Sequence, residues 1–342
     1  MELTFDLNTI WFLLIGALLS GYAILDGFDL GVGMLHLFVK EDKERRIMLN
    51  SIGPVWDGNE VWLVTGGGAL FAAFPHVYAT VFSGFYNAFM ILLFMLIFRA
   101  VAIEFRSKQP MKWWRQMWDV AFSVASFLIA LLMGVALGNI ITGIPIGPDK
   151  EFTGTFLGLL NPYALLIGIT TVALFMMHGS IYGVMKTEGE LQTRLRGWVN
   201  NSIIFFVICY VTSTMATLIY YQHMVENFRA APVIFVIALL NMLAIANIPR
   251  EISKGREIRA FFSSAASIAA LLFIFAVGIF PNIVYSNPNP EFSLNIYNAA
   301  SSENTLTIML IIALIGIPFV FAYTITIYWI FRGKVKIDEM SY

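Results

Sequence analysis

The chain alternates between long apolar runs and short polar stretches over nearly its whole length. A helix that crosses a bilayer needs about 20 mostly apolar residues, and the pattern predicts nine such helices. They lie at roughly 8–38, 50–74, 79–103, 118–141, 160–186, 199–222, 231–248, 259–280 and 305–331. The longest connections of the predicted outer face, 142–159 and 281–304, are rich in Gly, Pro, Asn and Ser and are typical of loops. We therefore expect an all-α integral membrane protein, with 1–342 as one membrane domain.

The basic residues predict the orientation of these helices. All of the 21 lysines and arginines except Lys150 and Arg229 fall after the first, third, fifth or seventh segment or in the tail. Loops on the cytoplasmic side of a membrane are enriched in Lys and Arg. The N-terminus is therefore expected outside and the C-terminus in the cytoplasm, which requires an odd number of crossings.

A weak internal repeat divides the chain. An offset of 152 residues aligns Leu13–Gly16 with Leu165–Gly168, and it also aligns Gly27 and Gly31 with Gly179 and Gly183. The repeat predicts two pseudo-equivalent four-helix units, 8–141 and 160–280, with 305–331 as an extra ninth helix. Short matches in apolar sequence also arise by chance, so a chain without duplication stays an alternative.

Composition agrees with a membrane protein and excludes some chemistry. Hydrophobic residues make up 58% of the chain and charged residues only 13%, against about 25% charged in soluble domains. The single cysteine, Cys209, excludes an intrachain disulfide and a Cys-ligated cluster. The first ten residues carry no Lys or Arg, so we expect no cleaved signal peptide. No feature points to a nucleic-acid partner.

Acidic residues inside the first two segments are the candidate functional groups. Asp26 and Asp29 lie in LDGFD, and Asp57 and Glu60 lie in WDGNE. Residues three apart share a helix face, and helix rise places Asp29 about 14 Å and Asp57 about 10 Å from the cytoplasmic ends of their segments. Facing carboxylates at one depth could relay protons. The alternative is structural: such acids also pair with Arg or Lys, or accept hydrogen bonds, to hold helices together.

Histidine and metal chemistry are weakly indicated. Of His36, His76, His178 and His223, only His178 lies well within a predicted helix. A haem needs a buried axial donor, so His178 is a candidate, but a buried histidine hydrogen-bonded to a neighbour is the more frequent case. No metal-ligand spacing of the H-x-x-x-H or C-x-x-C kind occurs, and no metal site is predicted.

The motifs resemble a known family. GYAILDGFDLGVGML, ERRIMLNSIGPVWDGNEVWLVTGGGALFAAFP, SGFY, FRAVAIEFRSK and NPYALLIG are similar to subunit II of the cytochrome bd-type quinol oxidases. The resemblance implies a complex in the cytoplasmic membrane of a bacterium or archaeon, which oxidises membrane quinol, reduces oxygen to water and generates proton motive force. This subunit would stabilise a haem-bearing subunit I and would not be active alone.

The resemblance also implies cofactors, partners and residue roles. Haem b and haem d belong to subunit I, some members hold a structural quinone in subunit II, and a small single-helix subunit often completes the complex. Asp26, Asp29 and Asp57 take the positions linked with proton delivery. Some relatives have an amide at Glu60, which argues against an obligatory acid there. Trp56 and Asn59 of the same motif are candidates for contact with a bound cofactor.

Two other functions fit the same residues. A proton-coupled secondary transporter would also use parallel repeats, glycine-interrupted helices and acids within the membrane. A purely structural scaffold would use the acids only to hold helices together. Copurification with a haem-bearing partner distinguishes the oxidase subunit from the transporter, and mutant kinetics distinguish it from the scaffold.

Overall fold

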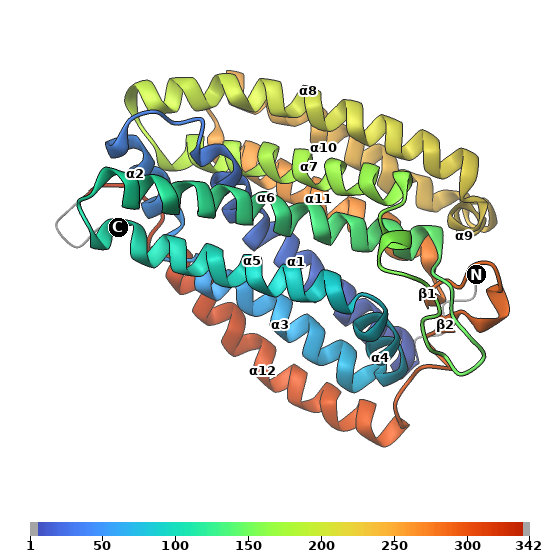
Figure 1. The fold of residues 1–342 in the computed structure, drawn as a ribbon. Helices are drawn as coiled ribbons and strands as arrows, with labels where there is room; N and C mark the ends of the chain where they lie inside the picture. The colour runs from blue at the N-terminus through green and yellow to red at the C-terminus, as the bar shows by residue number, and fades with distance from the viewer. Residues whose placement is uncertain (1–5, 338–342) are drawn as a thin grey trace.

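The computed structural model describes residues 6–337, which form a bundle of long helices with their axes roughly aligned (Figure 1). Eight helical segments in this range are long and apolar enough to cross a membrane. Six of the eight are single helices: α1 (Leu7–His36), α6 (Lys112–Thr142), α7 (Pro162–Lys186), α8 (Gly189–Tyr220), α11 (Glu257–Ile279) and α12 (Glu303–Ile330). In the other two, α5 (Tyr86–Phe105) is extended by the 3₁₀ turn η1 (Arg106–Lys108), and α10 (Phe235–Ser253) is preceded by η4 (Pro232–Ile234).

The segment 50–74 is not one helix, which corrects the prediction. The amphipathic helix α2 (Asp42–Ile52) ends before Pro54, and α3 (Trp56–Ala73) begins two residues after it. Proline lacks the amide hydrogen that a helix interior needs, so the chain breaks there. The helix α3 is long enough, but its first turns are polar, and it is not among the eight apolar helices.

Two further boundaries differ from the prediction. The segment 79–103 is divided at Phe85 into α4 (Pro75–Gly84) and α5. Pro249 lies inside α10, whereas the sequence pattern places it at the border. The local sequence indicates neither the division at Phe85 nor the continuation of α10 through Pro249. A proline inside a membrane helix is tolerated where neighbouring helices compensate for the lost hydrogen bond.

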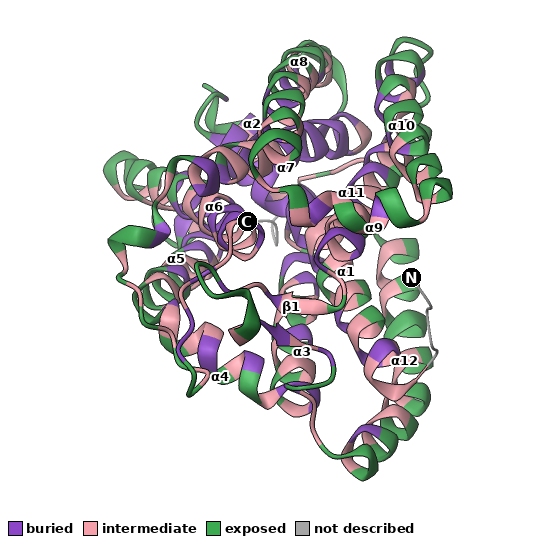
Figure 2. Ribbon diagram, turned by 90° about the vertical axis from the view of Figure 1, so that its right-hand side faces the viewer, coloured by how far each residue is buried: buried purple, intermediate pink, exposed green. Residues whose placement is uncertain are grey.

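The core lies along α1, α6 and α7, where buried residues are concentrated (Figure 2). Glycine permits the closest approach. A Cβ atom on Gly31 of α1 would lie 2.0 Å from the carbonyl oxygen of Phe175 and 2.7 Å from Cα of Gly179 on α7. Helices in membranes pack closely through such small residues. By contrast, α8, α10 and α12 expose many apolar side chains on their outer faces.

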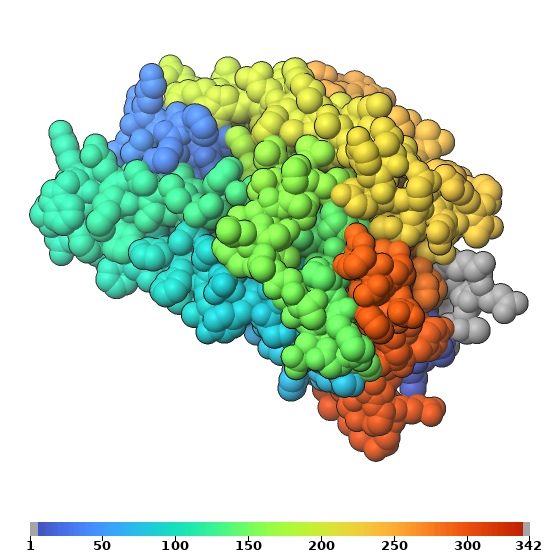
Figure 3. Space-filling view, turned by 45° about the vertical axis from the view of Figure 1, so that its right-hand side comes forward, coloured from blue at the N-terminus to red at the C-terminus, as the bar shows by residue number. Residues whose placement is uncertain are grey.

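The two predicted loops cover one end of the bundle, and 281–304 contains two short strands. Strands β1 (Asn282–Val284) and β2 (Leu294–Asn295) pair antiparallel, and a bridge joins Ile144 to Ser286. The two segments lie side by side on the surface (Figure 3). The remaining short elements are η2 (Leu157–Leu159), η3 (Gln222–Val225), α9 (Glu226–Ala230) and η5 (Pro290–Phe292).

The first and last long helices begin at the same end of the bundle. The indole Nε1 of Trp11 in α1 donates a hydrogen bond to the carbonyl oxygen of Leu306 in α12 at 3.0 Å. The end of α12 therefore lies at the opposite end of the bundle, beside α2 and the end of α7 (Figure 1).

Candidate functional site

Arg99 of α5 joins two of the predicted acids. Its Nη1 and Nη2 donate to the two carboxylate oxygens of Asp26 at 2.9 and 2.6 Å, and Nη2 also donates to Oε1 of Glu60 at 2.6 Å. Arg99 and Asp26 are almost fully buried, and Glu60 is partly buried. A two-point contact between guanidinium and carboxylate is both strong and directional. The site therefore locks α1, α3 and α5 together through charged groups.

Asp29 belongs to a second chain of hydrogen bonds. The Asn59 amide nitrogen donates to Oδ2 of Asp29 at 2.7 Å and to the carbonyl oxygen of Leu25 at 3.1 Å. The Tyr328 hydroxyl of α12 in turn donates to Oδ1 of Asn59 at 2.9 Å. Asp29 and Asn59 are buried. This chain connects the acid of α1 to α12 through one amide of α3.

Three buried polar atoms of this region have no protein partner within residues 6–337. They are the hydroxyl of Tyr22, Oδ1 of Asp29 and Nε of Arg99. Buried polar groups in proteins nearly always have a hydrogen-bond partner, and internal water is the usual one where protein groups do not suffice. The cluster therefore retains hydrogen-bonding capacity after all its protein contacts are made.

Asp57 lies apart from the other acids. Its side chain is exposed and forms no hydrogen bond with Asp26 or Asp29, although it is only one turn from Glu60. The prediction that Asp57 faces the acids of the first helix is wrong. In α3 the side chain of Asn59 is buried against Asp29 and that of Glu60 reaches Arg99, whereas Asp57 lies on the exposed face.

The two candidates for cofactor contact are occupied by the protein itself. Both amide hydrogens of Asn59 bond to groups of α1, and its oxygen accepts from Tyr328. Trp56 is buried in the main hydrophobic cluster. Their side chains position α3 against α1 and α12.

Arg99 and Tyr328 are the site residues that sequence reasoning missed. The basic-residue pattern grouped Arg99 with the cytoplasmic side, and its burial among acids corrects that grouping. A signal was present, because Arg99 lies between the apolar runs MILLFMLIF and AVAI, and an arginine at such a position is usually paired with an acid. Nothing in the sequence around Tyr328 separates it from the other tyrosines of its segment.

The histidines do not fit a haem. Nδ1 of His178 contacts the Ser264 hydroxyl at 2.7 Å, and its Nε2 contacts the carbonyl oxygen of Ile24 at 3.0 Å. The prediction of a buried histidine bonded to neighbours is confirmed. Nε2 of His36 bonds to Asp119, and Nε2 of His223 bonds to the carbonyl oxygen of Ile141. His76 is exposed on α4. Within residues 6–337 no group of three His, Cys, Asp or Glu side chains could hold a metal ion.

The fold and the site define a multi-pass membrane protein whose buried charges join α1, α3 and α5. The family pattern described as cytochrome bd terminal oxidase subunit II matches residues 7–331, and the chain belongs to that family. It is therefore one subunit of an oxidoreductase complex that contains haem, and it has a subunit I as partner.

Relatives span nearly the whole chain. The cytochrome bd-I ubiquinol oxidase subunit 2 of Escherichia coli K12 is 36% identical over 98% of this chain and 97% of its own length. The cytochrome bd ubiquinol oxidase subunit 2 of Bacillus subtilis 168 is 35% identical over 98% and 99%. A chain in the solved bd oxidase of Geobacillus thermodenitrificans has the same fold, with a TM-score of 0.79, 15% identity and coverage of 95% of this chain and 98% of that one. The comparisons support the oxidase function and not the transporter alternative.

Proposed function

We propose that this subunit supplies a proton path to the oxygen-reducing site of its complex, through the polar cluster of α1, α3 and α5. One observation carries the proposal: three carboxyl groups lie near one guanidinium inside an apolar bundle. Arg99 bonds to Asp26 and Glu60, and the buried Asp29 is bonded to Asn59 instead. Such an excess of acid over base allows a buried cluster to take up and release protons. The unpartnered atoms of Tyr22, Asp29 and Arg99 are suited to hold water, which connects carboxyl groups too far apart for direct transfer.

Asp57 occupies a different place on this path. Its exposed side chain lies on the outer face of α3, near the exposed Val61 and Val64. A Cβ atom added at Gly67 or Gly68 on the same helix would meet no atom of this chain within 4 Å. Small residues on an open helix face favour close packing against another helix. We therefore place subunit I against this face, with Asp57 at the contact, where it passes protons between the cluster and the partner.

The membrane arrangement follows from the ends of the helices. With α3 as a ninth crossing beside the eight apolar segments, the chain crosses the membrane an odd number of times. This agrees with the positions of its ends, because the start of α1 and the end of α12 lie at opposite ends of the bundle. The basic residues then put the N-terminus outside and the C-terminus in the cytoplasm of a bacterium or archaeon. The close contact of α1 with α7 is consistent with two four-helix units, 8–141 and 160–280, followed by 305–331.

The redox groups are assigned to the partner. Because the histidines of this chain are engaged or exposed, we propose that haem b and haem d reside in subunit I. Oxidation of membrane quinol then also takes place in subunit I, with or without a small single-helix subunit. The residues of this chain hold and move protons, and they stabilise the partner.

The test uses the purified complex with Asp57→Asn and Asp26→Asn variants. Loss of a carboxyl group needed for proton transfer is expected to slow oxygen reduction by roughly tenfold or more, with the haem absorption spectrum unchanged. Glu303→Gln, which alters an exposed acid in the first turn of α12, is the control. Normal turnover and proton uptake in both variants would exclude the proton path, and loss of haem would indicate a structural role instead.

A further inference from the structure

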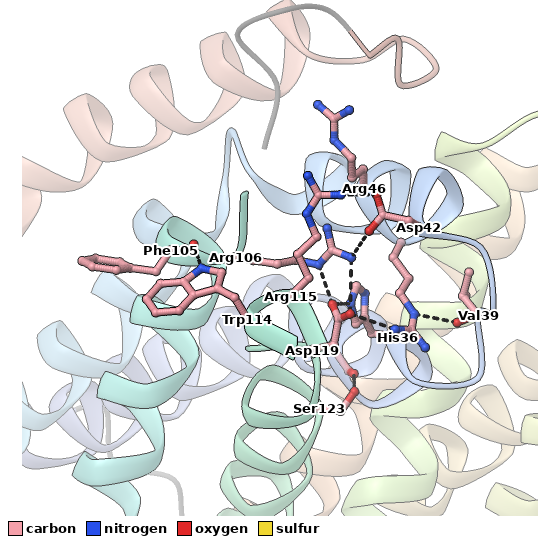
Figure 4. A network of polar contacts seen from close by, with 12 residues as sticks. His36, Val39, Asp42, Arg46, Phe105, Arg106, Trp114, Arg115, Asp119 and Ser123 are labelled. Carbon is pink, nitrogen blue, oxygen red and sulfur yellow. Dashed lines mark hydrogen bonds and ion pairs between the residues drawn. The ribbon is translucent and has the colours of Figure 1, made fainter. Parts of the chain in front are cut away.

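A second buried ion network lies at the α2 end of the bundle (Figure 4). Its centre is Asp119 of α6, which is 1% exposed. The carboxylate accepts hydrogen bonds from Nε2 of His36 at 2.5 Å, from Nη1 of Arg45 at 2.8 Å and from Nε of Arg106 at 2.5 Å. One carboxylate thus binds three basic side chains that come from three different elements.

Each of these three elements continues to the polar cluster of α1, α3 and α5. His36 is the last residue of α1, seven residues after Asp29, and Arg106 follows α5, seven residues after Arg99. Seven residues of helix correspond to about 10 Å along the axis. Arg45 lies in α2, which leads through the break at Pro54 to Asn59 and Glu60 of α3. The ends of α1 and α5 are therefore bonded to one carboxylate about two helical turns from the site, and α2, which leads into α3, is bonded to the same carboxylate.

We propose that Asp119 is a positioning residue for the proton-transfer cluster: it holds α1, α5 and the α2–α3 connection in the register at which Asp26 meets Arg99 and Asn59 meets Asp29. This inference rests on the proposed function. A salt bridge on the surface would not hold these helices in register, because exposed pairs contribute little to stability. Asp119 is buried, and loss of its charge leaves the buried His36 without a carboxylate partner and Arg106 with only the half-exposed Asp42.

The neighbouring charges support this assignment. Asp42 of α2 accepts from Nη2 of Arg106 at 2.8 Å and from Nη1 of Arg115 at 3.0 Å, and so forms an outer layer over the network. The side chain of Asp42 is about half exposed, whereas that of Asp119 is buried. Asp42 therefore adds to the attachment of α2 without replacing the buried carboxylate.

A separate ion pair on the other side of α2 offers a matched control. Glu44 of α2 accepts two hydrogen bonds from Arg194 of α8, at 2.9 and 3.0 Å. The hydrogen-bond distances are similar to those at Asp119, although Arg194 is partly exposed. The helix α8 carries no residue of the polar cluster. If attachment of α2 to any helix sufficed, loss of Arg194 and loss of Asp119 would have equal effects at the site.

The experiment compares Asp119→Asn, Asp119→Glu and Arg194→Gln in the purified complex with subunit I. Backbone amide exchange over 55–60 reports the position of α3 independently of catalysis. We expect at least tenfold faster exchange there in Asp119→Asn, since a buried charged hydrogen bond is lost. We also expect kcat for oxygen reduction to fall by roughly threefold to tenfold with KM for quinol unchanged. Asp119→Glu should restore both quantities, and Arg194→Gln should change neither.

The outcomes separate this inference from the proposed function. Equal exchange over 55–60 in Asp119→Asn and Arg194→Gln overturns the positioning role. Faster exchange with normal turnover and proton uptake supports the positioning role and contradicts the proton path. If Asp119→Asn does not assemble, Arg45→Gln removes the contact of Arg45 with Asp119 and its bond to the carbonyl oxygen of Val39. Unchanged exchange in that variant overturns the inference.

Discussion

Arg99 and Asp26 form a two-point ion pair in which both side chains are almost fully buried, although they lie 73 residues apart in the chain. The pair joins α5 to α1 in the apolar interior, and Glu60 of α3 completes it. Removal of one partner of a buried pair costs far more than the pair contributes, because the remaining charge is left without compensation.

Arg99→Gln should therefore be the most destabilising single change in this cluster. Asp26 and Glu60 would both lose their cation, and the cost expected for such a loss is about 3–5 kcal/mol. Arg99→Lys should be intermediate, because an ammonium cannot make the same planar two-point contact. The measurement is the fraction of complex that remains assembled with subunit I as temperature rises.

Glu60→Gln is the matched comparison for Arg99→Gln. The amide oxygen can still accept from Arg99, and Asp26 still compensates the guanidinium. Assembly with subunit I should therefore resemble the wild type. If Glu60→Gln were as damaging as Arg99→Gln, Asp26 would not be the principal counter-ion of Arg99.

Tyr328→Phe removes the hydrogen bond to Oδ1 of Asn59 and nothing else of comparable size. The expected loss of stability is about 0.5–1.5 kcal/mol. The freed Asn59 amide can rotate away from Asp29, so oxygen reduction should slow while the haem spectrum is retained. Tyr323→Phe, on the exposed side of the same helix, is the control and should behave as the wild type. Equal rates of oxygen reduction in the two variants would show that the orientation of the Asn59 side chain does not affect proton transfer.

Gly31→Ala should disrupt the contact between α1 and α7. The added Cβ would lie 2.0 Å from the carbonyl oxygen of Phe175, and the backbone there cannot move without shifting α7. Overpacking of this kind costs about 1–3 kcal/mol. Gly16→Ala on the same helix, where a Cβ would meet nothing within 4 Å, should be neutral or slightly stabilising. Thermal inactivation of the two variants checks the difference, and a tolerant Gly31→Ala would contradict the packing.

The segments around His223 should loosen in acid. Burial lowers the pKa of His223, which stacks on Tyr285 with ring centroids 4.1 Å apart and bonds to the carbonyl oxygen of Ile141. Since the unfolded histidine has a pKa of about 6.5, the unfolded state binds more protons below that pH. The contribution of His223 is therefore complete above about pH 6.5 and is lost as pH falls below it.

Amide exchange at Ile144, which donates to the carbonyl oxygen of Tyr285, reports this effect. Exchange corrected for its intrinsic pH dependence should accelerate on acidification in the wild type. His223→Phe keeps an aromatic ring against Tyr285 but cannot titrate, so its corrected exchange should not vary over the same range. An identical acid response in both proteins would assign the effect to another group.

The sequence by itself determined the membrane class, most of the helices and the family. These features are local: twenty apolar residues cross a bilayer wherever they occur, and motifs such as WDGNE are read without knowledge of contacts. Buried acids were also recognisable, since charge within an apolar run stands out at once. The prediction that His178 bonds to neighbours succeeded for the same reason, because burial of a polar ring requires partners.

Only the tertiary structure decided which polar groups meet. Asp57 and Glu60 lie one turn apart, yet α3 is oriented so that Glu60 reaches Arg99 and Asp57 is exposed. The partners Arg99, Asp119 and Tyr328 come from segments far apart in the chain, so helix periodicity alone cannot assign them. Rotation and register of whole helices depend on side-chain packing summed over many contacts, and that sum is not a property of any single stretch of sequence.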